Sequence, residues 1–298
     1  MYFVTVNGRE YVTAHDKTLV TFLRDELNMT GTKDAANADW VLVDGVKTSA
    51  RAVRLRELKD REIVTIEGLD EAEIGALAAG AGDVGSGFFA PGMVISAKAE
   101  GRRGEPVAVD ERHTGKKLFA DDINVPRQVY VRPIFAGNIG AKITGIDFSK
   151  ALENVRFGDC ILKADIPGKF DGMVGVGDTV RSAEDVAALV VTTYLAEMNV
   201  LCNSIKIEYD AVTDTPARQV PDMPECAAAL YSDDDTLTVY TNGGEPERTR
   251  RECAEALNIP EDRITCVASP VEGIESGRAE VFAALTAWLT QQSAKVKY

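Results

Sequence analysis

The stretch GTKDAANADWVLVDG, Gly31–Gly45, decides the fold of the first part of the chain, because a polar loop runs directly into a short apolar strand. Before it, the alternating segment YFVTVNGREYVTA is broken by Asn7 and Gly8, a strong sequence signal for a β-hairpin. The segment KTLVTFLRDELNMTG follows with apolar residues at helical spacing, and REIVTIEGL predicts a later strand. Strands around one helix within about 70 residues predict a small β-grasp-like unit over residues 1–78.

The rest of the chain divides into three parts by composition. Residues 79–112 hold a glycine-rich linker, GAGDVGSGFFAPG, a short helix, MVISAKAE, and an exposed connector. Residues 113–212 contain strand patterns such as QVYVRPIFA and DVAALVVTT with one helix, and they predict a compact α+β domain. Residues 213–298 begin with a linker and then alternate strands and helices. The predicted fold class of the whole chain is therefore α+β.

The balance of charges excludes one class of partner. The 298-residue chain has 33 Lys and Arg against 47 Asp and Glu, a formal net charge of −14. Nucleic-acid binding needs clustered cations, and the one basic cluster, Arg248–Arg251, is flanked by glutamates as on a solvated helix face. The chain has no apolar run that could span a bilayer, and its start lacks the features of a signal peptide. We therefore expect a cytoplasmic protein without nucleic-acid or membrane partners.

Cysteine and histidine usage restricts the metal sites that the chain could form. Its only histidines are His15 and His113, and the two closest cysteines are 13 positions apart (266 − 253). A zinc or iron–sulfur site built from closely spaced ligands is therefore not expected. Each thiol is instead expected to be buried and inert. The cysteines are Cys160, Cys202, Cys226, Cys253 and Cys266.

Several other patterns admit both a functional and a simpler structural interpretation. Asp233–Asp235 could suggest a calcium loop, but SDDDT lacks the glycine and distal glutamate of an EF-hand, so a hairpin turn is predicted. Glu272 and Glu275 could form a general acid/base pair, but a solvated loop is the simpler interpretation. GVGDT and GAGDVG match no phosphate-binding fingerprint. Packing roles rather than cofactor contacts are expected for Trp40, Phe282, Leu285, Trp288 and Leu289.

Stretches along nearly the whole chain together resemble the xanthine dehydrogenase, or molybdenum hydroxylase, family. TLVTFLRDELNMTGTK resembles the helix before the family's first iron–sulfur loop, and GFFAPGMVISAKAE resembles the loop and helix at its second cluster. TGKKLFADDINVP, DTVRSAEDVAALVVT and IKIEYD resemble the hammerhead domain of aldehyde oxidases. MPECAAALYSDDDTLTVYTNGG and AEALNIPEDRITCV resemble the start of the molybdopterin-binding region. The order is nearest to selenium-dependent xanthine dehydrogenases with a fused ferredoxin unit.

The resemblance implies four domains. Residues 1–78 would be a degenerate ferredoxin-like β-grasp unit, and residues 79–112 a linker with the remnant of the second-cluster helical domain. Residues 113–212 would be a hammerhead-like α+β domain, and residues 213–298 a truncated molybdopterin-binding-like domain.

Both sets of cluster ligands are missing from the stretches that carry the resemblance. The family places three cysteines after GTK and a fourth one strand later, whereas this chain has the short loop DAANAD and Ala50 at the fourth position. At the second cluster the family's CGFC is replaced by SGFF, with Ser86 and Phe89 at the ligand positions. Because thiolates hold the irons directly, neither cluster is expected, and Phe89 is expected to fill vacated volume.

The part that resembles the molybdenum side departs from the family in the same way. The resemblance places the family's glycine-rich cofactor loop at VEGIESGR, where only Gly273, Gly277 and Arg278 agree with it. Glu272 and Glu275 would repel an anionic pterin. The family's glutamine after the YT strand is also absent, and the family continues for several hundred residues past KVK. We therefore expect that this chain alone hydroxylates no substrate.

These departures imply a chain with no catalytic, cofactor-binding or metal-binding residues and with no cofactor. Because the apolar patterns persist around the altered loops, we expect a non-catalytic structural or regulatory subunit that assembles with a full-length molybdenum hydroxylase. A hetero-oligomer is expected, and a homo-oligomer stays open. Two alternatives also stay open: one half of a split xanthine dehydrogenase-like oxidoreductase completed by another chain, and an assembly factor that holds the pterin or an immature partner.

Overall fold

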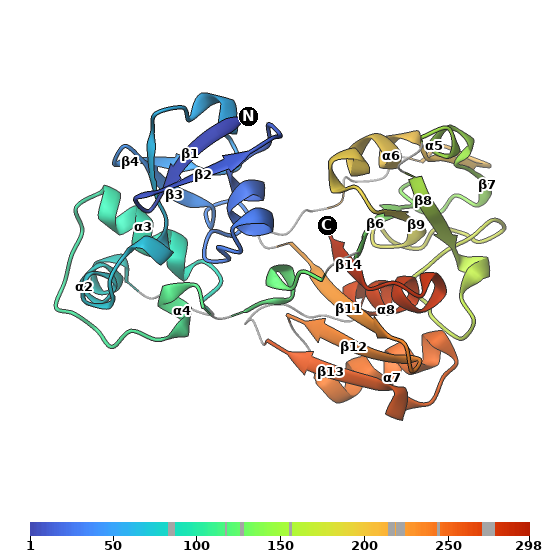
Figure 1. The fold of residues 1–298 in the computed structure, drawn as a ribbon. Helices are drawn as coiled ribbons and strands as arrows, with labels where there is room; N and C mark the ends of the chain where they lie inside the picture. Colours follow the sequence, from blue (N-terminus) through green and yellow to red (C-terminus); the bar gives the residue numbers. More distant parts are fainter. Residues whose placement is uncertain are drawn as a thin grey trace. The chain divides into compact units, whose positions relative to one another are not determined.

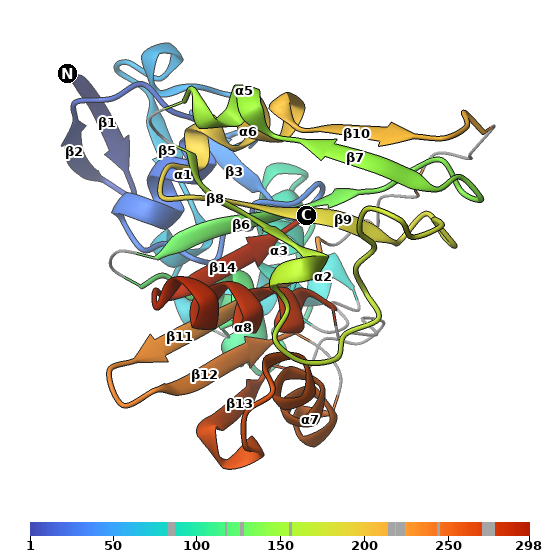
Figure 2. The same ribbon diagram turned by 90° about the vertical axis from the view of Figure 1, so that its right-hand side faces the viewer.

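The computed structural model describes residues 1–82, 87–116, 118–125, 128–154, 157–213, 218, 224–242, 245–269 and 278–298. The chain forms two compact units, Met1–Asp122 (unit 1) and Ile123–Tyr298 (unit 2), drawn in Figures 1 and 2. Both units mix helices and strands, so the predicted α+β class is correct. The only division into compact units follows Asp122, ten residues beyond the predicted boundary at 112/113, and the finer division into four domains stays a prediction.

Unit 1 is built on a five-stranded sheet with the strand order β2-β1-β5-β3-β4. Asn7 and Gly8, both at positive φ, join the first two strands in the hairpin that the sequence predicts. The central pair β1 and β5 is parallel, and the other neighbours are antiparallel. The strands are β1 (Tyr2–Val6), β2 (Arg9–Thr13), β3 (Trp40–Val43), β4 (Val46–Ser49) and β5 (Glu62–Val64).

Helices cover the sheet of unit 1 with apolar side chains. The Thr18 hydroxyl caps α1, and Leu19, Phe22 and Leu23 are buried in a core with strand residues. Helices α2 and α3 pack on each other, and α3 packs on β3, where Trp40 is half-buried against their core. The helices are α1 (Leu19–Thr21), η1 (Phe22–Glu26, a π-helix), η2 (Leu55–Glu57), η3 (Ile66–Gly68), α2 (Glu71–Ala81), α3 (Ala90–Ala99), α4 (Glu111–Thr114) and η4 (Ala120–Asp122).

Unit 2 is built on a seven-stranded sheet with the order β13-β12-β11-β14-β6-β9-β8, beside a two-stranded sheet of β10 and β7. Strand β14 pairs with β11 on one side and with β6 on the other, so strands from the predicted domains 113–212 and 213–298 share one sheet. The strands are β6 (Val129–Phe135), β7 (Ile143–Asp147), β8 (Phe157–Leu162), β9 (Val186–Thr192), β10 (Lys206–Tyr209), β11 (Cys226–Ser232), β12 (Thr236–Thr241), β13 (Ile264–Ala268) and β14 (Ala294–Lys297).

The main helix of unit 2 is α8, which packs on β11, β12 and β14 beside α7 (Figure 2). Phe282 and Leu285, which belong to this helix, are fully buried, as expected, and Trp288 is half-buried. The same expectation is wrong for Leu289, which is 39% exposed because it lies in the last turn of the helix. The helices are α5 (Ser149–Leu152), η5 (Lys163–Asp165), η6 (Leu195–Glu197), α6 (Met198–Ser204), α7 (Pro246–Leu257), η7 (Glu261–Arg263) and α8 (Arg278–Thr290).

One smaller prediction is confirmed in this unit. Asp233–Asp235 forms the turn of the hairpin between β11 and β12, as predicted, with Ser232 opposite Thr236. Within the described parts of the chain, no helix is both long enough and apolar enough to cross a membrane.

Candidate functional site

The loop before β3, which resembles the approach to an iron–sulfur site, is closed by hydrogen bonds within unit 1. The Lys33 amide donates to the Ala38 carbonyl at 3.1 Å across the loop. The buried Asp39 carboxylate accepts hydrogen bonds from the Ser49 hydroxyl and, at 3.2 Å, from the Arg51 amide. Backbone hydrogen bonds and the Asp39 carboxylate therefore hold the loop against the end of β4.

The residues at the ligand positions of the resemblance do not fit a cluster. Ala50 is completely buried, and its amide and carbonyl bond to the Asp39 carbonyl and the Val20 amide, both at 3.0 Å. All five cysteines lie beyond residue 122, so unit 1 has no thiolate for an iron atom. Ser86 lies outside the described residues. Unit 1 therefore offers no cysteine ligand to either of the family's iron–sulfur clusters.

Aromatic side chains pack on one another near the segment before α3, which resembles the family's second cluster loop. Phe88 is almost fully buried, and its ring centroid lies 5.2 Å from that of Phe89 and 5.2 Å from that of Phe119, both edge-on. Phe89 itself is half-buried. The expected filling side chain, Phe89, is thus only part of the packing, and the neighbouring Phe88 is the more deeply buried ring.

Four charged side chains that have no signal in the sequence lie buried near the loop before β3. They are Arg24, Lys33, Asp121 and Asp122, and each side chain is no more than 5% exposed. Burial lowers the pKa of the Lys33 ammonium, and the attraction of Asp122 only partly offsets this. Burial acts on Arg24 in the same direction, but Asp121 and Asp122 outweigh it and raise the pKa of the guanidinium. The 89 to 98 residues between the partners left no local sequence signal for these contacts.

The second candidate site lies where β12 ends and α8 begins. Glu280, in the first turn of α8, is 1% exposed and accepts a hydrogen bond from the Thr241 hydroxyl. Asn242, also buried, follows Thr241. The Arg278 guanidinium, which the resemblance places at the end of the cofactor loop, donates to the Glu184 carbonyl. The Glu280 side chain thus lies in the first turn of α8, at the positive end of the helix dipole, which is the position that anions favour.

Four of the residues named from the sequence belong to the loop before α8. Glu272, Gly273, Glu275 and Gly277 lie outside the described residues. The acid/base and solvated-loop interpretations of the two glutamates therefore stay predictions. Glu280 was missed because its acidic side chain lies in an apolar helix pattern and its hydroxyl partner is 39 positions away.

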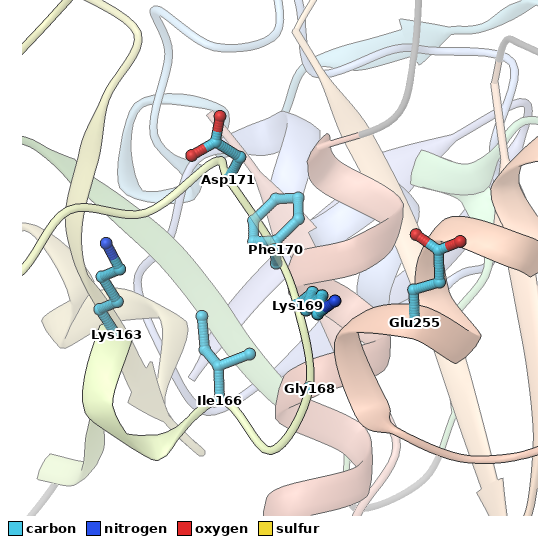
Figure 3. A pocket seen from close by; sticks show the side chains of 7 residues that line it. All are labelled: Lys163, Ile166, Gly168, Lys169, Phe170, Asp171 and Glu255. Carbon is cyan, nitrogen blue, oxygen red and sulfur yellow. The ribbon is translucent and has the colours of Figure 1, made fainter.

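A hollow of about 460 Å³ lies on unit 2 between the segment 163–171 and α7, as Figure 3 shows. The Gly168 and Lys169 amides, each at 2.9 Å, donate to carbonyls in the last turn of α7. Lys163 forms an ion pair with Asp178 at 2.7 Å. The charged side chains of the lining are two lysines and two carboxylates, and the lining has no histidine or cysteine. Its lining residues are Lys163, Ile166, Gly168, Lys169, Phe170, Asp171 and Glu255.

The thiols of unit 2 have an environment that lowers their reactivity. All five are free, with Cys202 and Cys266 half-buried and the other three buried. Burial raises the pKa of Cys160 to about 12 and the pKa of Cys266 to about 11, so little thiolate exists at neutral pH. Among the residues that the structure describes, no group of three or more His, Cys, Asp or Glu side chains is placed to hold a metal ion.

The chain is similar in sequence or in structure to several oxidoreductases. No family model matches the chain. Aldehyde oxidase 2 of Macaca fascicularis is 25% identical over 228 residues, an alignment that covers 58% of this chain and 17% of that protein. The aldehyde oxidoreductase from Desulfovibrio gigas superposes over 100% of this chain and 49% of its own, with a TM-score of 0.77 and 19% identity. The enzyme from Desulfovibrio desulfuricans gives the same TM-score and coverage with 15% identity.

This chain matches only part of the length of each of these proteins. The quinoline 2-oxidoreductase from Pseudomonas putida matches only 63% of this chain, with a TM-score of 0.53. The chain spans about half the length of the two aldehyde oxidoreductases and 17% of aldehyde oxidase 2, so the activities of those proteins do not transfer with the fold. The chain is similar in sequence to aldehyde oxidase 2 over 228 residues, and over its whole length it has the mixed α+β fold of the two aldehyde oxidoreductases.

Proposed function

We propose that this chain is a non-catalytic relative of the molybdenum hydroxylases and acts as a structural or regulatory subunit of such an enzyme. The observation that carries the proposal is the closed loop before β3. Asp39 bonds this loop to Ser49 and Arg51, and Ala50 occupies the fourth ligand position. A unit without thiolates cannot hold the clusters that would carry electrons.

The strand order supports a more specific assignment of unit 1. A sheet with the order β2-β1-β5-β3-β4 and a parallel central pair is compatible with a β-grasp unit of the ferredoxin type. In this assignment residues 1–78 are a degenerate ferredoxin-like unit. Residues 113–212 and 213–298 are the hammerhead-like and partial molybdopterin-binding-like regions, in the order found in selenium-dependent xanthine dehydrogenases with a fused ferredoxin unit.

The packing near the altered loops supports a structural role, in which the fold of the chain binds another protein. Buried charges are paired, and the rings of Phe88 and Phe119 are in contact. Such an arrangement stabilises the fold of unit 1, and the proposed partner that this fold binds is a full-length molybdenum hydroxylase in the cytoplasm. Glu280 weighs against a split enzyme, because a pterin completed by another chain would meet a buried carboxylate near the start of α8.

Co-expression tests this proposal directly. The chain is expressed alone and beside the molybdenum hydroxylase chains of its own host, and masses are measured by light scattering and native mass spectrometry. We expect a stable hetero-oligomer that buries on the order of 1,600 Å² of surface, with the hydroxylase keeping its own metal centres. An acidic protein of similar size serves as the control for non-specific association.

The outcomes separate the proposal from its alternatives. Activity that appears only when this chain is mixed with an otherwise inactive half would support a split enzyme. A pterin that stays bound to the chain after purification would support an assembly factor. The subunit proposal would be refuted if the chain binds no hydroxylase and its deletion leaves hydroxylase assembly and activity unchanged.

A further inference from the structure

The buried charges of unit 1 connect three segments that are distant in sequence. The Asp122 carboxylate accepts hydrogen bonds from Arg24 Nη2 at 2.9 Å, from Lys33 Nζ at 2.6 Å and from the Phe119 amide at 2.9 Å. Arg24 Nη2 also donates to the Asp121 carboxylate at 3.1 Å. Two cations and two anions thus join η1, the loop before β3, and η4 at the end of the unit.

The two cations also make contacts with carbonyl oxygens and aromatic rings. Arg24 Nη1 donates to the carbonyls of Thr30 and Thr32 at 3.3 and 3.0 Å. The Lys33 ammonium lies 4.7 Å from the ring centroid of Phe119 and 5.9 Å from that of Phe88. Desolvation makes any of these charges costly if its partner is lost, whereas removal of one cation together with one anion leaves a balanced pair.

We infer that Arg24, Lys33, Asp121 and Asp122 form an electrostatic latch that couples the folding of the loop before β3 to the folding of the segment 118–122. The latch needs no metal, because its cross-links are ion pairs and hydrogen bonds of the chain itself. It fixes the last residues of unit 1, from which the chain continues into unit 2. This inference does not depend on the partner proposed above, since it concerns the folding of unit 1 alone.

Thermal unfolding of full-length variants tests the latch. The chain has two tryptophans, and a Trp288→Phe background leaves Trp40 as the fluorescence probe of unit 1. Asp122→Asn is expected to lower the midpoint of unit 1 by about 10 °C or more, because it leaves two buried cations with one carboxylate. The matched control is Asp44→Asn, which weakens an exposed ion pair with Arg61 at 2.6 Å and should shift the midpoint by about 4 °C or less.

A double variant separates a latch from a set of independent contacts. Lys33→Met with Asp122→Asn leaves Arg24 and Asp121 balanced, so we expect it to recover at least half of the midpoint lost in Asp122→Asn. Lys33→Met is also measured alone. The inference is overturned if the midpoint losses of Lys33→Met and Asp122→Asn simply add in the double variant, or if Asp122→Asn shifts the midpoint no more than Asp44→Asn does.

Amide hydrogen exchange of the unaltered protein tests the latch without any variant, and it therefore also applies if a variant does not fold. The amides of Phe119 and Asp122 are held by the Asp122 carboxylate and the Phe119 carbonyl. A latch predicts that they exchange only when the whole unit unfolds, at the rate of the β1 and β5 amides. Exchange of these two amides much faster than that of the sheet would show that the segment opens by itself and would overturn the inference.

Discussion

Phe282→Ala is expected to lower the free energy of unfolding of unit 2 by about 3–5 kcal/mol. The Phe282 side chain is completely buried in α8, and its ring lies edge-on to Phe170 with centroids 5.7 Å apart and tilted against Tyr298 at 6.4 Å. Alanine would leave a cavity between the helix, the sheet and the segment that carries Phe170. Urea unfolding monitored by the fluorescence of Trp288, in a background without Trp40, measures the loss.

Leu289→Ala is the matched control, because the residue lies on the same helix and is 39% exposed. It should cost under about 1 kcal/mol. If both variants cost the same, α8 would not be packed on the sheet as described, and the core of unit 2 would have to be assigned to other side chains.

Asp39→Ala is expected to lower the free energy of unfolding of unit 1 by about 2–4 kcal/mol. The carboxylate accepts hydrogen bonds from the Ser49 hydroxyl and the Arg51 amide, and it is buried, so its removal leaves two donors without this acceptor. Trp40, the next residue, reports the opening of the loop by fluorescence during urea unfolding in the Trp288→Phe background.

Asp34→Ala is the control for this second prediction. Asp34 belongs to the same loop and forms an ion pair with Arg51 at 3.2 Å, but its side chain is 41% exposed. Exposed pairs contribute about 0–1 kcal/mol, so this variant should stay near the unaltered protein. Equal losses in the two variants would mean that Asp39 does not close the loop and that the account of the altered ligand site is wrong.

The sequence predicted the features of the fold that depend on neighbours along the chain. Asn7 and Gly8 favour a tight turn at positive φ, and both adopt it between β1 and β2. Asp233–Asp235 is a hairpin turn for the same local reason. Phe282 and Leu285 could be placed in the core because helical spacing brings them to one face. Leu289 shares that spacing, but the helix ends one residue later, which a periodic pattern does not reveal.

For the candidate site near the loop before β3, the sequence predicted only which ligands are missing. The sequence shows that cysteines are missing at the ligand positions, but it does not show what takes their place. Asp122 meets Lys33 from a distance of 89 residues, and Thr241 meets Glu280 from 39, so both contacts depend on tertiary folding. The pairing of β14 with β6 is another long-range contact, and it unites strands that composition assigned to separate domains.

The most direct test of the central claim is the metal content of the full-length protein purified without oxygen. Iron and molybdenum are measured by elemental analysis, and the visible absorption spectrum is recorded beside that of an intact iron–sulfur protein purified in the same way. The account predicts no stoichiometric iron and no cluster absorption, because unit 1 has no cysteine and the loop before β3 is closed by Asp39. Stoichiometric iron together with the spectrum of an iron–sulfur cluster would contradict it.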